Sequence, residues 1–341
     1  MNADALYRGL LKPLLFSLSA ETAHNVALQQ LQAISAAPSL LRQLERFQPP
    51  PKPKKVFGLT FPNPVGLAAG FDKNGVALPA WAALGFGFVE VGTVTAQPQP
   101  GNPKPRIFRY PEQEALINRL GFNNDGAEVV AARLRALRDR GSWPAIPVGI
   151  NIGKSKVTPM ERAVEDYLFS FRLLAPLADY VVLNVSSPNT PGLRSLQEQD
   201  ALAGLLRAIR DENQTVGKPV LVKIAPDLSI PELEQIVASC EQHEIAGMIA
   251  TNTTLDHTSI LGAGDQAGGL SGRPLRGKST EFVRAITSRS ALPVIASGGI
   301  TDAVSGREKI EAGAQLLQVY TGYVYRGPGL LREIVEALDA P

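Results

Sequence analysis

Two lysines stand in sequence contexts that could support chemistry. Lys223 lies inside the apolar run 220–224, and Lys73 closes the segment 68–73, directly after another apolar run. An ammonium group inside an apolar strand needs a counter-charge, because burying an unpaired charge is costly. Lys223 is therefore either half of a structural salt bridge or a positive group presented to an anionic ligand.

Asparagines recur near the ends of the apolar runs. An amide side chain offers both a donor and an acceptor, and a single one is typical of a turn. Several amides around one cavity would suit a planar ligand that carries alternating C=O and N–H groups and a carboxylate. The asparagines are Asn118, Asn123, Asn151, Asn184, Asn189 and Asn252.

Two adjacent serines, Ser186 and Ser187, lie in a loop between Asn184 and Thr190. A serine hydrolase is disfavoured, since no Gly-x-Ser-x-Gly turn surrounds them and His243 falls in a predicted helix. A loop hydroxyl can still act as a weak base when hydride departure from a substrate makes a neighbouring proton acidic.

These residues need a scaffold that gathers strand ends in one place. From Asn63 onward, eight short apolar runs without polar alternation each precede a helical pattern. Such units predict an α/β fold, a (β/α)8 TIM barrel with an N-terminal two-helix extension. The predicted strands are residues 65–69, 88–91, 148–152, 180–184, 220–224, 248–250, 294–297 and 316–319. The predicted helices are residues 75–84, 126–140, 159–177, 198–214, 230–243, 278–289, 302–312 and 328–338.

Loop lengths indicate which end of the barrel carries the site. The loops that follow strands two, four and six are long and polar, at residues 92–125, 185–197 and 251–277. Long loops in a compact domain are usually functional, and barrel active sites lie at the carboxyl ends of the strands. We therefore expect the site at that end.

Glycine turns follow the last two strands, at Gly298-Gly299 and at Gly322. They are either ordinary tight turns or a phosphate site, whose usual place in barrels is after strands seven and eight. With a phosphate there, the ammonium of Lys223 would suit the N1/O2 edge of a flavin, where negative charge develops on reduction.

Composition excludes several classes of protein. Of 341 residues, 44% are hydrophobic and 19% charged, so the chain can bury a large core. One cysteine, Cys240, and three histidines leave no disulfide framework and no metal site of a usual kind. A net charge of +2 argues against nucleic acid as a partner.

The first 55 residues form a different surface, with seven Lys and Arg against three acids. Leu6, Leu10 and Leu14 share one helix face, Ser19 can cap a second helix, and residues 48–55 are Pro-rich. A secretory signal is disfavoured, because Lys12 and Pro13 interrupt the apolar stretch. The two predicted helices either dock on the barrel or lie on a membrane surface. We expect a helical extension at 1–47, a linker at 48–62 and the barrel at 63–341.

Five segments resemble the class 2, quinone-dependent dihydroorotate dehydrogenases. They are residues 68–75 (AAGFDKNG), 117–124 (INRLGFNN), 184–190 (NVSSPNT), 251–254 (TNTT) and 268–275 (GGLSGRPL). The resemblance spans roughly residues 5–338. It implies an FMN-containing barrel that oxidises (S)-dihydroorotate to orotate in pyrimidine biosynthesis and passes the electrons to a membrane quinone.

The resemblance also implies roles for single residues, with Ser187 as the catalytic base. The implied FMN contacts are Ala69, Gly70, Phe71, Asp72, Lys73, Thr93, Asn151, Asn184, Lys223, Thr251, Gly272, Gly299, Tyr320 and Thr321. The implied dihydroorotate contacts are Lys73, Asn118, Arg119, Leu120, Gly121, Phe122, Asn184, Asn189, Asn252 and Thr253. The implied quinone contacts are His24, Arg109 and Tyr320.

For location, the resemblance implies contact with a membrane. Because the start of the chain, with Asp4 and few arginines, does not look like a mitochondrial presequence, we expect a peripheral protein on the cytoplasmic face of a bacterial inner membrane. Other flavin barrels fit less well, because neither a histidine nor a cysteine base stands at a suitable strand end. An aldolase-like barrel with Lys223 as a Schiff base, or an inactive membrane-docking barrel, would need no flavin.

Overall fold

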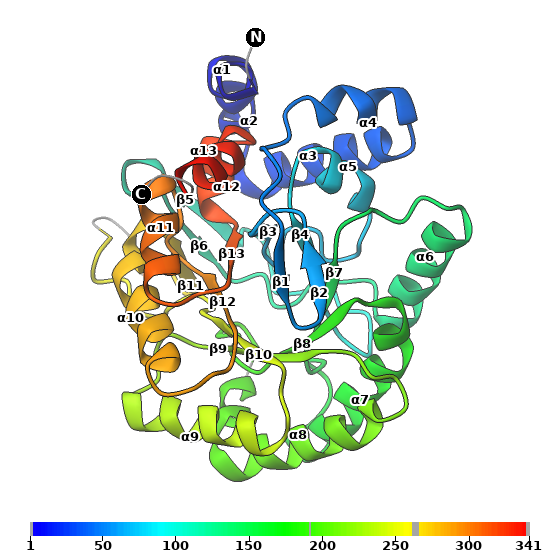
Figure 1. The fold of residues 1–341 in the computed structure, drawn as a ribbon, viewed down its shortest axis with the longest axis vertical. Helices are drawn as coiled ribbons and strands as arrows, with labels where there is room; N and C mark the ends of the chain where they lie inside the picture. The colour runs from blue at the N-terminus through cyan, green and yellow to red at the C-terminus, as the bar shows by residue number, and fades with distance from the viewer. Residues whose placement is uncertain (1–2, 191, 261–265, 339–341) are drawn as a thin grey trace.

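Eight parallel strands form a closed barrel, in the order β10-β12-β13-β3-β4-β7-β8-β9 (Figure 1). The computed structural model describes residues 3–190, 192–260 and 266–338. The ends of the expected extension and barrel (1–2 and 339–341) and part of the sixth loop (261–265) therefore lie outside the described residues. The barrel strands are β3 (Val65–Leu67), β4 (Phe88–Val94), β7 (Val148–Ile152), β8 (Tyr180–Asn184), β9 (Val220–Ile224), β10 (Gly247–Ala250), β12 (Val294–Ser297) and β13 (Leu316–Val319). The predicted barrel is confirmed.

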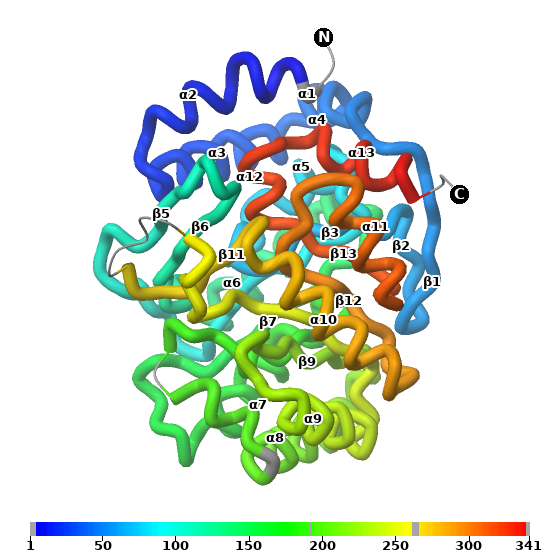
Figure 2. Tube along the Cα trace, turned by 90° about the vertical axis from the view of Figure 1, so that its left-hand side faces the viewer, coloured from blue at the N-terminus to red at the C-terminus, as the bar shows by residue number. Residues whose placement is uncertain are grey.

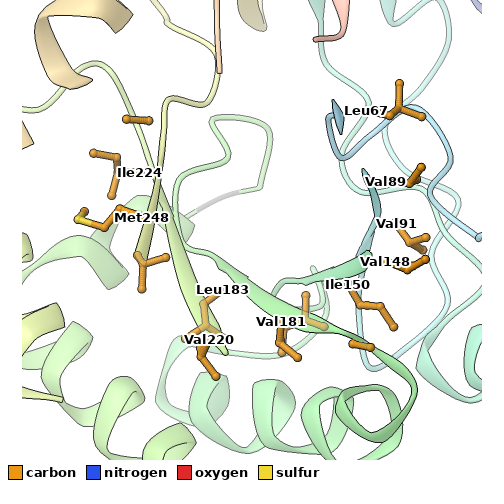
Figure 3. Packing of buried hydrophobic residues seen from close by; sticks show 14 of the residues in the cluster. Leu67, Val89, Val91, Val148, Ile150, Val181, Leu183, Val220, Ile224 and Met248 are labelled. Carbon is orange, nitrogen blue, oxygen red and sulfur yellow. The ribbon is translucent and has the colours of Figure 1, made fainter. Parts of the chain in front are cut away.

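The two faces of each strand carry different residues, because successive side chains point to opposite sides. One set, which includes Val181 and Leu183 of β8, packs outward in a large apolar cluster together with residues of the surrounding helices (Figure 3). The alternate set fills the barrel interior. Phe88, Tyr180 and Leu316, the first residues of three strands, form its apolar layer, and Glu90 and Lys223 lie further along the strands.

Eight outer helices follow the strands as the sequence predicts, within a few residues at most ends. They are α5 (Leu78–Ala83), α6 (Ala127–Asp139), α7 (Ala163–Leu174), α8 (Gln199–Asn213), α9 (Ile230–Gln242), α10 (Arg276–Thr287), α11 (Ala303–Glu311) and α13 (Gly329–Ala337). The short helix α12 (Thr321–Arg326), directly after β13, was not predicted. Short turns of helix adjoin the outer helices at η3 (Met160–Arg162), η4 (Ala175–Leu177), η5 (Leu193–Gln197) and η6 (Arg273–Leu275), and a further one, η2 (Pro111–Gln113), lies in the second loop.

The N-terminal segment folds into more helix than predicted. A first rod comprises α1 (Ala3–Leu6), η1 (Tyr7–Leu11) and α2 (Lys12–Ser17), and α3 (Ala20–Ser35) follows. Ser19 caps α3, since its hydroxyl accepts from the Thr22 amide at 3.3 Å. The unpredicted α4 (Pro38–Glu45) begins with a proline, which the first turn of a helix tolerates. Both α3 and α4 pack on α5.

Two small sheets were not predicted. A hairpin of β1 (Lys54–Val56) and β2 (Leu59–Phe61) lies within the segment expected to be a linker, and Val56 and Phe61 cover the apolar layer at the amino end of the barrel. The second sheet, in the order β11-β6-β5, joins β5 (Ile107–Tyr110) and β6 (Ala115–Asn118) of the second loop to β11 (Gly269–Gly272) of the sixth. It brings these two loops together beneath α2 and α3 (Figure 2).

Candidate active site

A cavity opens at the carboxyl ends of the barrel strands, beside the inserted sheet. It encloses about 1060 Å³ of empty space, including solvent at its mouth. Eleven of the fourteen predicted FMN contacts line it: Ala69, Gly70, Lys73, Thr93, Asn184, Lys223, Thr251, Gly272, Gly299, Tyr320 and Thr321. Nine of the ten predicted dihydroorotate contacts do so too: Lys73, Asn118, Leu120, Gly121, Phe122, Asn184, Asn189, Asn252 and Thr253. The predicted base, Ser187, is also on the lining.

Four predicted contacts lie behind this lining. The buried carboxylate of Asp72 accepts hydrogen bonds from the amides of Val76 and Ala77, both at 2.9 Å, so it holds the turn into α5. Asn151 lies beneath Thr93, and the guanidinium of Arg119 reaches outward to the Pro105 carbonyl at 2.9 Å.

Phe71, the fourth of these, is buried within an aromatic cluster. Its ring centroid lies 5.0 Å from that of His24 on one side and 5.0 Å from that of Tyr320 on the other. Only Tyr320 of these three reaches the main cavity. The aromatic rings therefore connect α3 to the cavity wall.

The counter-charge of Lys223 is Glu90. The Lys223 ammonium lies 3.7 Å from a carboxylate oxygen of Glu90, which is wholly buried. The amides of Asn151, at 2.8 Å, and Gln318 also donate to this carboxylate. The salt-bridge interpretation of Lys223 is therefore confirmed. Lys223 also lies on the cavity lining, so a role toward an anionic ligand stays a prediction.

Amide side chains form one hydrogen-bonded network along the wall. Asn184 donates to the Thr93 hydroxyl at 2.9 Å, and Thr93 donates to Asn151 at 2.6 Å. Asn252 donates to the Ser186 hydroxyl at 3.0 Å. Because these bonds fix each amide plane, the wall presents donors and acceptors in set directions.

The Ser187 loop is held from outside the cavity by Arg194. Its guanidinium donates to the carbonyls of Ser186 at 3.2 Å and Thr253 at 3.3 Å, and it pairs with Asp227 at 2.9 Å. Burial alone would raise the pKa of Asp227, but hydrogen bonds from the Thr254 hydroxyl, the Lys278 ammonium and Arg194 lower it.

Sequence reasoning missed Glu90, Gln318 and Arg194. A signal existed for the first two, since each interrupts an apolar strand as Lys223 does. The inserted sheet also supplies lining residues that were not predicted, among them Ile107, Leu116 and Ser271, because its loops were treated as irregular.

The glycine turn after β12 has the features of an anion site. Gly298 and Gly299 both line the cavity and have φ of 103° and 73°. Within the described part of the chain, the Gly299 amide N–H has no protein acceptor. The Oε1 atom of Gln318, buried in the floor, likewise has no partner there. The two groups suit a ligand that accepts a hydrogen bond from the Gly299 N–H and donates one to the Gln318 Oε1 atom.

The predicted quinone contacts do not share one described cavity. His24 lines a second cavity of about 510 Å³ whose walls include Lys73, Ile107 and Leu120, which also line the main one. Burial lowers the pKa of His24 to about 3, with the Lys73 charge adding to the fall, so the ring stays neutral at ordinary pH. Arg109 donates to carbonyls of the α2 end, including that of Leu15 at 3.3 Å, and so ties α2 to β5.

Comparisons with known proteins agree with this arrangement. The sequence model of the family described as "Dihydroorotate dehydrogenase" matches residues 53–340. The chain belongs to the dihydroorotate dehydrogenase family. Similar proteins named "Dihydroorotate dehydrogenase (quinone)" include that of Chloroflexus aurantiacus, at 52% identity over 99% of this chain and 97% of the relative. That of Cronobacter sakazakii is 49% identical over 98% of this chain and 100% of the relative. The resemblance to the quinone-dependent class is thus confirmed.

Solved structures of the same family share the fold. The crystal structure of DHODH from Eimeria tenella in complex with ferulenol superposes with a TM-score of 0.84 at 39% identity, covering 92% of this chain and 90% of that one. The ligand-free form from the same organism gives a TM-score of 0.83 over 92% and 93% of the two chains.

Proposed function

We propose that this dihydroorotate dehydrogenase oxidises (S)-dihydroorotate to orotate, with FMN as hydride acceptor and a membrane quinone as the final electron acceptor. The observation that carries the proposal is the convergence of Lys73, Ser187 and the amide side chains on one cavity whose floor holds the buried Lys223–Glu90 pair. A Schiff base at Lys223 is disfavoured, because an ammonium paired with Glu90 is a poor nucleophile.

The residues present fit FMN. The Gly299 amide, which has no acceptor among the described residues, and the neighbouring Gly298 suit its phosphate. The Lys223 ammonium suits an electron-rich ring edge. When bound, FMN supplies the acceptor for the hydride that leaves C6 of the substrate.

The protein's own residues orient the substrate and move its proton. Lys73 would pair with the substrate carboxylate, and Asn118, Asn189 and Asn252 would hold its ring amides. Ser187 would take the proton from C5. The Ser187 hydroxyl is nearly buried and accepts a hydrogen bond from the backbone N–H of Asn189 at 3.3 Å, which would hold it close to the substrate ring.

The N-terminal helices would meet the membrane. No helix in the described part of the chain is long and apolar enough to span a bilayer. Among the described residues, five of the ten exposed large hydrophobic side chains nevertheless lie within the first 40 residues: Leu10, Leu11, Leu14, Val26 and Leu40. Apolar residues concentrated on short helices favour peripheral contact with a lipid surface, where quinone is available. We place this contact on the cytoplasmic face of a bacterial inner membrane.

An anaerobic titration tests the proposal. The purified protein should be yellow, dihydroorotate should bleach it, and a quinone added with detergent should restore the colour. A colourless protein that takes up no FMN, or a flavin that dihydroorotate leaves oxidised, would contradict it.

The rate should depend on the protonation of Lys73. Burial lowers the pKa of Lys73 to about 8, with Arg106 adding to the fall, whereas Glu21 and Asp72 oppose it. The charged form is lost as pH rises through this value, so kcat/KM for dihydroorotate should fall about tenfold per pH unit above it. Steady-state rates between pH 6 and 10 measure this.

Two variants control this experiment. Glu21→Gln removes a charge that raises the Lys73 pKa, so the alkaline fall should begin at lower pH. Glu45→Gln, an exposed acid on α4 of the same extension, should leave the profile in place. If Glu21→Gln does not shift the pH at which kcat/KM falls, the fall does not report the deprotonation of Lys73.

A further inference from the structure

A buried lysine outside the cavity has no acidic partner among the described residues. Lys309 of α11 is 0% exposed, and among the described residues no carboxylate lies within 4.0 Å of its ammonium. The preceding residue, Glu308, pairs instead with Arg276. Burial lowers the pKa of Lys309 to about 7, against the opposing charge of Glu308. Burying an ammonium without a carboxylate partner costs stability, which other interactions have to offset.

The ammonium makes three hydrogen bonds, all to neutral oxygens at the start of α10. It donates to the Arg276 carbonyl at 2.9 Å, to the Thr280 hydroxyl at 2.6 Å and to the Ser279 hydroxyl. Ser279 in turn donates to the carbonyl of Gly298 at 2.7 Å. A continuous chain of bonds therefore runs from Lys309 to the glycine turn at the cavity.

The Gly298 carbonyl sets the direction of the next amide. The peptide bond between Gly298 and Gly299 is trans, so its C=O and N–H point in opposite directions. With the carbonyl held by Ser279, the Gly299 N–H is turned away from α10. Gly299 lines the cavity, and its N–H has no acceptor within the described part of the protein.

The turn also packs directly on the start of α10. A Cβ atom on Gly299 would lie 2.2 Å from the Cα of Arg276, so the two backbones are in close contact. Any shift of this first turn of α10 would move the glycine turn. Lys309 bonds the carbonyl and two side chains of that same turn of helix.

We propose that Lys309 is a positioning residue for the phosphate of the flavin: through Ser279 it orients the Gly298–Gly299 turn, and it supplies positive charge behind it. This inference rests on the proposed function, because it takes FMN as the ligand. The negative charge of a phosphate bound at the Gly298–Gly299 turn would offset the positive charge of the buried Lys309 ammonium.

The test compares two flavins that differ only in the phosphate. Flavin is removed from the full-length protein, and FMN and riboflavin are each titrated by flavin fluorescence. Lys309→Met should weaken FMN binding by about 5- to 30-fold, the effect of losing 1–2 kcal/mol. Riboflavin affinity should change by less than about twofold. Equal losses for both flavins, or no loss for FMN, would overturn the proposal.

A matched pair of milder variants keeps the test decisive if Lys309→Met does not fold. Ser279→Ala and Thr280→Val each remove one hydroxyl acceptor of Lys309, but only Ser279 bonds Gly298. Ser279→Ala should weaken FMN relative to riboflavin, and Thr280→Val should not. An equal ratio of FMN affinity to riboflavin affinity in the two variants would overturn the link through Ser279.

Two further controls separate other causes. Lys154→Met removes another buried lysine, whose ammonium donates to the Ser155 carbonyl at 2.9 Å and which is not on the cavity lining. It should leave the FMN-to-riboflavin ratio unchanged, and a change there would contradict a specific role for Lys309. A wild-type protein that binds neither flavin would overturn the proposed function and this inference together, whereas wild-type binding with unchanged variants would overturn the inference alone.

Discussion

Ser187→Ala is expected to lower turnover by roughly 10²–10⁴-fold, the usual contribution of a general base. The substitution removes the hydroxyl that would accept the C5 proton. It leaves the glycine turn and Lys223 intact, so the flavin should stay bound. Stopped-flow reduction of the flavin by dihydroorotate, without oxygen, measures the affected step directly.

Ser195→Ala is the matched control for this variant. Ser195 lies in the same loop, but its hydroxyl donates to the Gly192 carbonyl at 2.8 Å and is not on the cavity lining. Its removal should leave flavin reduction nearly at the wild-type rate. Near-normal reduction in Ser187→Ala would exclude Ser187 as the base.

Replacing both Leu10 and Leu14 by aspartate should separate the two half-reactions. These side chains are 62% and 63% exposed on the N-terminal rod. Inserting a leucine into lipid is worth about 1.5–3 kcal/mol, so losing two should weaken vesicle binding by roughly 10²-fold or more. Reduction of a quinone dissolved in the vesicles should fall in proportion, while flavin reduction by dihydroorotate should not change.

Co-sedimentation with vesicles that contain anionic lipid measures the binding. Val129→Asp is the control, because Val129 is 50% exposed on α6 of the barrel and not on the extension. It should leave both vesicle binding and quinone reduction intact. Wild-type quinone kinetics in the double aspartate variant would contradict a role of this surface in quinone access.

The arrangement of Glu90 with Lys223 illustrates how far a single sequence can be interpreted. The need for a counter-charge follows from Lys223 alone, since its strand is otherwise apolar. The identity of the paired acid cannot be predicted from Lys223, because Glu90 lies 133 positions away on β4. Only barrel closure, which places β4 and β9 around one interior, brings the two together at 3.7 Å.

The same contrast applies to the N-terminal region. Helical periodicity and the Ser19 cap are local signals, and they predicted α3 correctly. The hairpin of β1 and β2 was missed, because its three-residue strands are stabilised by Val56 and Phe61 packing on the barrel interior. Short strands carry too little local preference to be recognised without the surface they cover.

By itself, the sequence determined the eight βα units and the end of the barrel that carries the site. These two features depend on periodicity and on residue types at strand ends, which act over a few residues. Most of the predicted residues on the cavity lining came instead from the resemblance of five sequence segments to the family. The tertiary structure alone decided which predicted contacts lie behind the lining, as Asp72 and Asn151 do, and how Lys309 of α11 reaches the turn after β12. Such features depend on side-chain direction and on contacts between distant segments, and these exist only once the barrel has closed.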